Sequence, residues 1–423
     1  MSTAADFLKR HGMDPARVEP ARDALKMMEE MERGLAGDDS SLPMIPTYLS
    51  DDGAIPKDTS VVVIDAGGTN FRRALITFDD PGYRVEELSK WKMPGIERPA
   101  TWEEFISFTA DNIMPLLDRA DKVGFCFSFS AEVTPEIDGR VQRIDKEVVI
   151  TGCEGQLVAA SLSAELERRG IFGKKIVILN DTVAVLLGGL ASVRRSEYSG
   201  FVGQVSGTGT NTCCSLPAGR IGKLGTASGR SMIVNLESGM YDGIKGGDFD
   251  RILDEESHNP GEKHFEKLTA GVYLGELCHL MLKAAADESL LSPEASERVR
   301  ALGWIDSAVI DAWASGEHLE QICENAEDEA FVEEICRAMF ERSARCMCTN
   351  LAAILLLTGA GKTAERPACI CAEGSLVQKG RAYRPVLERL LRDEVGGKLG
   401  LFAEYRIGNE TTLPGSAAAA LLN

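Results

Sequence analysis

Two short glycine turns, each set between strand-like segments, constrain the fold of this chain more than any other feature. In Val61–Phe78 an apolar run ends in Asp65, passes through Gly67–Asn70 (Gly-Gly-Thr-Asn) and continues in a second apolar run. About 140 residues later, Gly207–Asn211 (Gly-Thr-Gly-Thr-Asn) also joins two apolar runs. Apolar runs of this length around a tight turn predict strand–turn–strand units. Two such units in one chain predict a duplicated α/β core.

The residue types in these turns suit the binding of phosphate. Glycines have no Cβ, so their backbone N–H groups can approach an anion closely. One such turn alone is usually a structural hairpin, but two of the same type could hold different phosphates of one nucleotide. Asp65, at the end of a strand, could face Mg²⁺ held by those phosphates.

Composition limits the possible partners and the compartment. The 423 residues suffice for two or three domains with cores of their own. The formal net charge is −19, which predicts neither a nucleic acid nor an anionic membrane as a partner, because both bind basic surfaces. The eleven cysteines stand mostly in apolar runs without metal-type spacing, which predicts reduced, buried thiols in a cytoplasmic protein. The apolar run Leu351–Leu357 is too short to cross a bilayer and predicts a buried helix.

Periodicity and turn residues predict the other elements. Residues 1 to about 35 are expected to form two helices, the second opened at Ala16 by Asp14-Pro15. A closing helix, Ala417–Leu422, is expected to follow Pro414-Gly415. The other expected elements are the strands 61–65, 71–78, 83–92, 122–129, 175–179, 201–205, 212–216 and 368–372, the helices 101–119, 156–169 and 182–193, and a mostly helical stretch from about 248 to 357.

Four residues could carry chemistry, although each has an ordinary structural interpretation as well. Asp181 ends an apolar run between the two turns, where it could be a general base or simply the cap of helix 182–193. Glu237 could equally be a solvated strand end. Glu266 could belong to a charged helix face, and Lys146 alone is indistinguishable from a surface charge.

Several motifs stand in a fixed order along the chain. Asp65–Arg72 reads Asp-Ala-Gly-Gly-Thr-Asn-Phe-Arg, Gly124–Phe129 reads Gly-Phe-Cys-Phe-Ser-Phe, and Asn180–Val183 reads Asn-Asp-Thr-Val. With Gly207–Asn211, they resemble in the same order the first phosphate motif, the sugar strand, the catalytic step and the second phosphate turn of the hexokinase family, which belongs to the actin/heat-shock-70/sugar-kinase group of ATPases. Further similar segments are Met44–Tyr48, Thr151–Gly155, Asn259–Gly261, Phe265–Leu268, Tyr273–Leu277 and Ala372–Leu376.

The resemblance implies an α/β fold in which two domains of duplicated ribonuclease-H-like, actin-like ATPase fold surround a cleft. The small domain would comprise residues 59–179 and 410–423, and the large domain residues 1–58 and 180–409. The reaction would be ATP-dependent phosphorylation of the 6-hydroxyl of glucose, with mannose or fructose as further substrates, at the entry to glycolysis. ATP and Mg²⁺ would be the cofactors.

The resemblance also assigns roles to individual residues. Asp181 would be the general base, and Asp65 would face Mg²⁺ through water. The sugar would be bound by Ser128, Asp145, Lys146, Asn180, Asp181, Asn211, Glu237 and Glu266. The nucleotide would be bound by Asp65, Gly67, Gly68, Thr69, Asn70, Arg72, Gly207, Thr208, Gly209, Gly374 and Ser375.

Two positions depart from the family pattern. Hexokinases place Thr before the sugar-binding lysine, where this chain has Asp145. An ionised carboxylate accepts hydrogen bonds but cannot donate them, so we expect Asp145 to narrow the range of accepted hexoses. The family's C-terminal phosphate loop, of the type Gly-Ser-Gly-Lys-Gly, is represented here by Thr412–Ser416 (Thr-Leu-Pro-Gly-Ser), without the lysine.

Three other functions remain as alternatives. A sugar kinase of the bacterial repressor/kinase type would carry a zinc-binding Cys-x-Cys-Gly-x-x-Gly-Cys segment, which this sequence lacks. An actin-like or chaperone ATPase would leave the sugar motifs without a purpose. A non-catalytic sugar sensor would not need Asp181 together with both phosphate turns.

Overall fold

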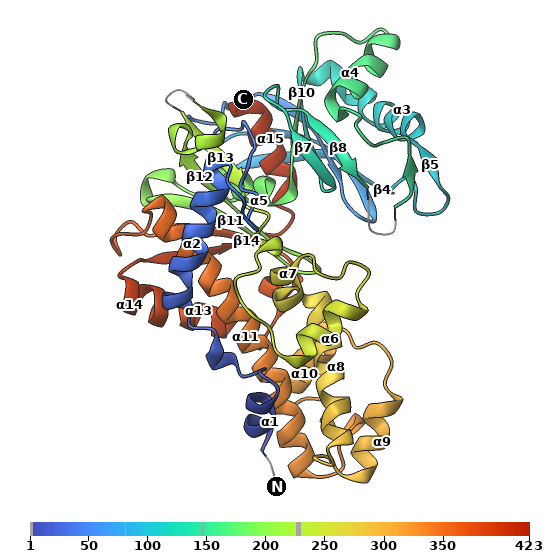
Figure 1. The fold of residues 1–423 in the computed structure, drawn as a ribbon. Coiled ribbons are helices and arrows are strands. Elements are labelled where there is room, and N and C mark those ends of the chain that lie inside the picture. The colour runs from blue at the N-terminus through green and yellow to red at the C-terminus, as the bar shows by residue number, and fades with distance from the viewer. Residues whose placement is uncertain (1–2, 81, 145–147, 226–229) are drawn as a thin grey trace.

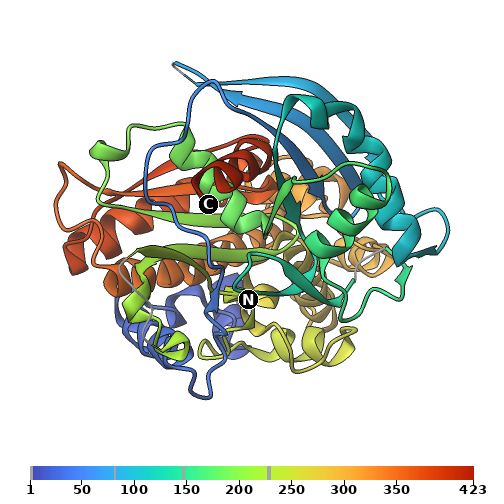
Figure 2. The ribbon, with the colours of Figure 1, turned by 90° about the horizontal axis from the view of Figure 1, so that it is seen from above.

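Two mixed β-sheets organise the computed structural model, which describes residues 3–80, 82–144, 148–225 and 230–423. Figure 1 shows one sheet in the upper lobe and the second beside and below it, with a long helical region extending to the N-terminal end. Figure 2, seen from above, shows the helix nearest the C-terminus lying between the two sheets.

The five-stranded sheet forms the core of the upper lobe. In spatial order it contains β10 (Lys175–Leu179), β6 (Lys122–Phe127), β2 (Ser60–Ala66), β3 (Asn70–Phe78) and β4 (Tyr83–Lys92). β2 pairs in parallel with β6 and antiparallel with β3. Helices α3 (Trp102–Ile113) and α4 (Val158–Arg168) cover one face, and α15 (Thr412–Leu422) covers the other. Because β2 is buried on both faces, it reads as an uninterrupted apolar run rather than an alternating one.

The six-stranded sheet forms the core of the larger lobe. In spatial order it contains β1 (Ile45–Pro46), β13 (Ser231–Asn235), β12 (Thr210–Pro217), β11 (Gly200–Ser206), β14 (Ala368–Glu373) and β15 (Ala403–Ile407). Helix α5 (Asp181–Ala191) packs on β11 and β14. The 33-residue helix α11 (Ala326–Thr358) packs in the main hydrophobic core on the other face.

The two sheets share one topology. If the two-residue strand β1 is set aside and the other strands of each sheet are numbered one to five in chain order, both sheets have the spatial order 3-2-1-4-5. In both, strands one to three form an antiparallel meander and strands four and five are added in parallel. The duplicated α/β core predicted from the two glycine turns is therefore confirmed.

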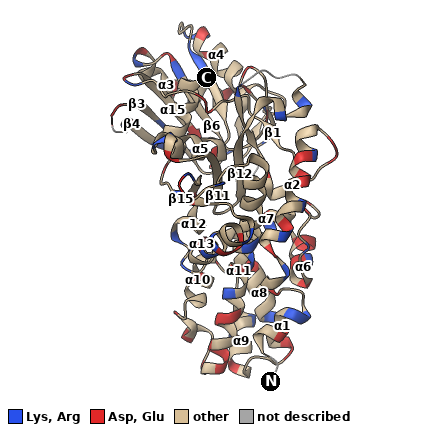
Figure 3. Ribbon diagram, turned by 90° about the vertical axis from the view of Figure 1, so that its left-hand side faces the viewer, with Lys and Arg blue, Asp and Glu red and all other residues tan. Residues whose placement is uncertain are grey.

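Helices α5 and α15 join the two sheets. α15 packs against β2 and β6, and it also contacts α5. The contact depends on glycine: a Cβ on Gly415 would lie 1.8 Å from the carbonyl oxygen of Ala184, and one on Gly188 would lie 2.3 Å from that of Thr411. Apart from Asp181, neither helix carries a charged residue, and both are tan in Figure 3.

The remaining elements complete the two lobes. The apolar run at residues 351–357 lies inside α11 and is largely buried, as predicted. The other strands form two small pairs, β5 (Ala100–Thr101) with β9 (Ile150–Thr151) and β7 (Ser130–Val133) with β8 (Gly139–Arg143). The other helices are α1 (Ala4–Arg10), α2 (Pro20–Ala36), α6 (Asp248–Glu256), α7 (His264–Thr269), α8 (Gly271–Asp287), α9 (Pro293–Ala301), α10 (Ser307–Ala314), α12 (Ser375–Lys379), α13 (Arg384–Leu390) and α14 (Gly397–Leu399).

Some predicted boundaries are wrong, for local reasons. The second N-terminal helix begins at Pro20 rather than Ala16, because residues 15–17 form only one 3₁₀ turn, capped by Asp14. The helix predicted to reach Arg119 ends at Ile113 and continues as a 3₁₀ segment, which contains a proline that has no N–H to donate.

The closing helix also begins earlier than predicted. It starts at Thr412, so Pro414 and Gly415 lie in its first turns rather than before it. Proline is tolerated there because the first N–H groups of a helix have no intrahelical partner. The sequence patterns did not predict the strands β1, β5, β7, β8, β9 and β15.

Two expectations concern the chain as a whole: the state of its cysteines and whether a helix could cross a membrane. All eleven cysteines are buried and unpaired, as predicted. Across the described ranges, no helix combines the length and apolar character needed to cross a membrane.

Candidate active site

The first glycine turn connects the end of β2 to the start of β3. The N–H of Gly67 donates to the carbonyl oxygen of Asn70 at 3.0 Å, which keeps the turn tight. A cavity of about 310 Å³ opens beside it. Its lining residues are Asp65, Gly67, Gly68, Thr69, Asn70, Arg72, Lys90 and Glu410. Six of these eight were predicted to bind the nucleotide.

Asp65 is held at the rim of this cavity by two neighbours. Its Oδ2 accepts hydrogen bonds from Arg72 Nε (3.1 Å), from Arg72 Nη2 and from Thr412 Oγ1 (3.2 Å). Its Oδ1 accepts no hydrogen bond from the described residues and therefore remains available to a ligand. A carboxylate oxygen is a suitable ligand for hydrated Mg²⁺, so Asp65 at this cavity fits this ion.

Strand pairing brings Asp65 and Asp181 to the same edge of the five-stranded sheet. Cys126 of β6 pairs with Asp65 on one side and with Leu179 of β10 on the other, and Asp181 follows Leu179 by two residues. Burial raises the pKa of the Cys126 thiol well above its ordinary value, and the charges of Asp65 and Asp181 raise it further. Both carboxylates therefore lie within electrostatic range of one buried sulfur atom.

Asp181 occupies the first turn of α5, but it is not the helix cap that the sequence suggested. The cap is Asn180, whose side-chain oxygen accepts from the Thr182 N–H at 2.8 Å. Asp181 Oδ1 accepts from the same N–H at 2.7 Å and from Thr182 Oγ1 at 3.2 Å. Oδ2 of Asp181 has no hydrogen bond within the described residues.

A connected group of amide and carboxylate side chains lies where β12 begins and β13 ends. Asn211 Nδ2 donates to Asn235 Oδ1 at 2.8 Å and to Glu237 Oε1 at 3.3 Å. Asn235 Nδ2 donates to the same Glu237 oxygen at 2.7 Å. Glu237 has a φ of 54°, a left-handed conformation that is strained for a non-glycine residue. The network therefore holds this carboxylate in a conformation that the backbone alone disfavours.

Glu266 joins this group from α7. Its Oε2 accepts from the backbone N–H of Thr210 at 3.2 Å, and Lys263 Nζ lies 3.4 Å from its Oε1. Glu266 therefore contacts the second glycine turn rather than lying on a purely solvated helix face.

The electrostatics of Glu237 show that these acids share one environment. Burial raises the pKa of Glu237 above its ordinary value of 4.5, and the charges of Asp181 and Glu266 raise it further. The hydrogen bond from Asn235 and the charge of Lys263 act in the opposite direction without cancelling the rise.

The second glycine turn packs against the Gly374–Ser375 step. The N–H of Gly207 donates to the carbonyl oxygen of Gly209 at 3.0 Å. A Cβ on Gly207 would lie 3.2 Å from the backbone nitrogen of Ser375, and one on Gly374 would lie 2.3 Å from the carbonyl oxygen of Ser206. Thr208 stands exposed on the turn. The predicted nucleotide residues of this lobe are thus assembled at one place.

Of the three remaining predicted sugar residues, the structure describes Ser128 alone. Ser128 follows β6, and its N–H donates to the carbonyl oxygen of Ala66 at 3.1 Å, beside the first turn. Asp145 and Lys146 lie outside the described residues, so the expectation that Asp145 narrows specificity stays a prediction.

Sequence reasoning missed four residues of the site. Asn235 stands two positions before Glu237, and Lys90 pairs with Arg72 across β3 and β4, so strand alternation was a usable signal for both. Glu410 reaches Arg72 from the end of the chain, and no local pattern predicted this. Thr412 begins the segment that represents the family's C-terminal phosphate loop, but its contact with Asp65 was not predicted.

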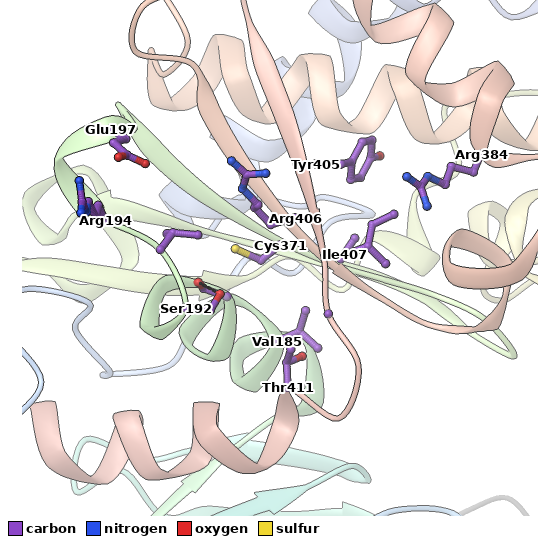
Figure 4. A pocket seen from close by; sticks show the side chains of 14 residues that line it. Val185, Ser192, Arg194, Glu197, Cys371, Arg384, Tyr405, Arg406, Ile407 and Thr411 are labelled. Carbon is purple, nitrogen blue, oxygen red and sulfur yellow. Dashed lines mark hydrogen bonds between the residues drawn. The ribbon is translucent and has the colours of Figure 1, made fainter. Parts of the chain in front are cut away.

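A larger cavity borders the same C-terminal loop, away from the predicted site. It measures about 730 Å³ and lies between α5, β14, β15 and the loop 408–411. Figure 4 shows Arg406 between Arg194 and Glu197 on one side and Tyr405 and Arg384 on the other. None of its lining residues is a predicted site residue, so the candidate active site does not include this cavity.

Comparison with known proteins agrees with the motifs and the topology. Two profiles described as hexokinase match residues 4–190 and 201–422. Hexokinase-5 of Oryza sativa subsp. japonica is 28% identical over 431 residues, covering 93% of this chain and 84% of the relative. Hexokinase-1 of Saccharomyces cerevisiae is 27% identical over 402 residues, covering 87% and 81%.

Solved structures agree as well. A hexokinase from Schistosoma mansoni complexed with glucose superposes with a TM-score of 0.78 at 21% identity, over 99% of this chain and 98% of that one. A second hexokinase crystal structure gives a TM-score of 0.81 at 20% identity, over 99% of both chains. These matches confirm the predicted two-domain, actin-like α/β fold. The chain therefore belongs to the hexokinase family and is a hexokinase, an enzyme that transfers a phosphoryl group from ATP to a hexose.

Proposed function

We propose that this hexokinase phosphorylates the 6-hydroxyl of glucose, with Asp181 as the general base. The observation that carries the proposal is the common location of Asp181, Glu237 and Glu266: the charges of Asp181 and Glu266 both raise the pKa of the buried Glu237, and Glu266 accepts from the second glycine turn. A hexose is a ring of hydroxyl donors, and this group offers several carboxylate and amide acceptors. A glucose complex of a structural relative supports the same sugar.

Asp181 has the chemistry that the first step needs. A sugar hydroxyl is a weak nucleophile at neutral pH, and a carboxylate within hydrogen-bond reach would accept its proton as the oxygen attacks the γ-phosphorus of ATP. Oδ1 is committed to Thr182, so Oδ2 would take this proton. Glu237, Glu266 and Asn211 would orient the ring, and analogues that lack a hydroxyl would leave buried acceptors unpaired.

The two glycine turns would hold the nucleotide. In the proposed arrangement the backbone of residues 67–70 and 207–209, with Arg72, Thr208 and Ser375, would contact the phosphates. Lys90 would add a second cation at the first turn, because it lines that cavity. Bound Mg²⁺ would neutralise the triphosphate, with Asp65 near its water shell.

The domain division belongs to the same proposal. Residues 59–179 and 410–423 would form the small domain, and residues 1–58 and 180–409 the large one. Movement of one sheet toward the other would bring the first turn to the sugar and exclude water, which competes for the same phosphate. The pair α5–α15 is the connection about which such closure would turn.

Sugar-dependent formation of ADP tests the proposed function directly. We expect ADP production from MgATP to be low without sugar and to rise strongly with glucose, and mannose and fructose can be compared in the same assay. Nuclear magnetic resonance of the product should place the phosphate on the 6-oxygen. Equal ADP production with and without glucose would favour the ATPase alternative, and no ADP at all would favour the non-catalytic sugar sensor.

The raised pKa of Glu237 predicts that glucose binding weakens at acid pH. Sugar hydroxyls donate to the ionised carboxylate, so protonation of Glu237 removes an acceptor and affinity should fall as the pH falls through its raised pKa. Without sugar, the free energy of unfolding depends on pH with the opposite sign, because the folded state holds this proton more tightly than the unfolded chain. That contribution to the free energy of unfolding is complete below pH 4.5 and is lost as the pH rises through the folded-state pKa.

Calorimetric titration with glucose between pH 5 and pH 8 measures this effect. The variant Glu237→Gln is the control, because an amide does not titrate in this range. Its affinity for glucose should be weaker and should depend less on pH. Parallel pH profiles in the two proteins would exclude Glu237 as the titrating group.

A further inference from the structure

The loop between β15 and α15 presents an acidic side chain to the first phosphate cavity. Glu410 has a φ of 58°, a left-handed conformation that side chains other than glycine and asparagine rarely adopt. The loop is fixed by Glu373, whose carboxylate accepts from the N–H of Glu410 at 3.2 Å and from that of Thr411 at 3.0 Å. The backbone N–H groups of Glu410 and Thr411 are therefore bound to a carboxylate and are not free to donate to a phosphate.

Glu410 makes the cavity electrically balanced. Its Oε1 lies 3.1 Å from Arg72 Nη1, and Arg72 is also paired with Asp65. The charged lining residues are thus two anions, Asp65 and Glu410, and two cations, Arg72 and Lys90. The segment that follows, Thr412–Ser416, contributes no cation. A cavity for triphosphate would ordinarily be expected to carry an excess of positive charge.

We propose that Glu410 is a specificity-determining residue that makes this cavity accept a nucleotide together with its divalent cation and reject metal-free polyphosphates. The inference rests on the proposed nucleotide site. Metal-free ATP carries about four negative charges, so it is repelled by Glu410 and must compete with it for Arg72. A divalent cation halves the charge of the ligand and gives the carboxylate a cation to face, directly or through water. The cavity therefore distinguishes metal-bound from metal-free nucleotide by the charge of the ligand when it binds, before phosphoryl transfer.

Binding of ATP with and without metal tests this role without using turnover. Calorimetric titration in the absence of sugar gives one dissociation constant with excess EDTA and one with excess Mg²⁺. In Glu410→Gln, which keeps the shape and an acceptor for Arg72, affinity for metal-free ATP should rise roughly tenfold, and affinity for MgATP should change less than about threefold. The gain should shrink at high salt, because 57% of the Glu410 side chain is exposed and its charge is screened. Glu410→Asn, a second neutral variant suited to the left-handed conformation, should behave alike.

Glu404→Gln is the matched control. Glu404 is an equally exposed carboxylate on β15, and it lies 3.6 Å from Arg406 rather than facing the phosphate cavity. Its replacement should leave the ratio of the two ATP affinities unchanged. An unchanged ratio in both Glu410 variants, in a protein that still binds MgATP and phosphorylates glucose, would overturn the role of Glu410 alone. Failure of the unaltered protein to bind ATP in either form would overturn the nucleotide site, and this inference with it.

Discussion

Replacing Asp181 by Asn is expected to lower the rate of glucose phosphorylation by roughly 10²–10⁴-fold, while glucose affinity stays close to that of the unaltered protein. An amide cannot take the hydroxyl proton, but it can accept the same hydrogen bonds from Thr182. The cap of α5 is supplied separately by Asn180 at 2.8 Å, so the helix should still begin at the same residue. The loss should therefore appear in the chemical step rather than in folding or sugar binding.

A single-turnover measurement is the right test, because product release can limit the steady-state rate and hide part of the loss. The matched control is Asp138→Asn, the same substitution at another helix N-terminus. Asp138 accepts from the N–H groups of Ala159 at 2.6 Å and Ala160 at 2.9 Å, at the start of α4. The variant Asp138→Asn should have a lower free energy of unfolding and an unchanged turnover rate. A near-normal rate in Asp181→Asn would mean that Asp181 has only a structural role in the first turn of α5.

The elements that could be predicted from sequence are those whose cause is local. The strands of the first meander were placed almost to the residue, because an apolar run, a glycine turn and a second apolar run all lie within Val61–Phe78. Asp181 was singled out because Asn180–Val183, just after a buried strand, resembles the family's catalytic step, and its role as the base stays a prediction. Parallel pairing of β10, β6 and β2 brings Asp181 and Asp65 to one edge of the sheet.

The features that could not be predicted depend on distant partners. Glu410 reaches Arg72 across 338 positions of sequence, and nothing near either residue indicates the pairing. Strand β15 is short, with an alternating and only half-buried pattern, and its pairing with β14 decides its structure. Gly415 reads as a helix breaker, yet it lies inside α15, because only a residue without a Cβ fits against the carbonyl oxygen of Ala184.

The same dependence on close backbone contact makes Gly124 a position where one methyl group should have a large effect. Gly124 lies in β6, within the motif that resembles the family's sugar strand. A Cβ there would lie 2.0 Å from the carbonyl oxygen of Ser416 and 2.5 Å from its carbonyl carbon. Both atoms belong to the backbone of α15, so no side-chain rotation can relieve the overlap, and the helix must move away from the sheet.

Gly124→Ala is therefore expected to destabilise the protein by roughly 3 kcal/mol, the upper part of the usual range for overpacking. Because Thr412 of α15 donates to Asp65 at 3.2 Å, the displaced helix should also disturb the first glycine turn and weaken the proposed nucleotide binding. Gly303→Ala is the control, since a Cβ on Gly303 would meet nothing within 4 Å and its backbone needs no left-handed conformation. Thermal unfolding, followed with and without MgATP, measures both consequences. Equal unfolding temperatures in the two variants would show that α15 does not press on β6. A lower unfolding temperature of Gly124→Ala with an unchanged stabilisation by MgATP would show that the packing of α15 is disturbed while its contact with Asp65 is kept.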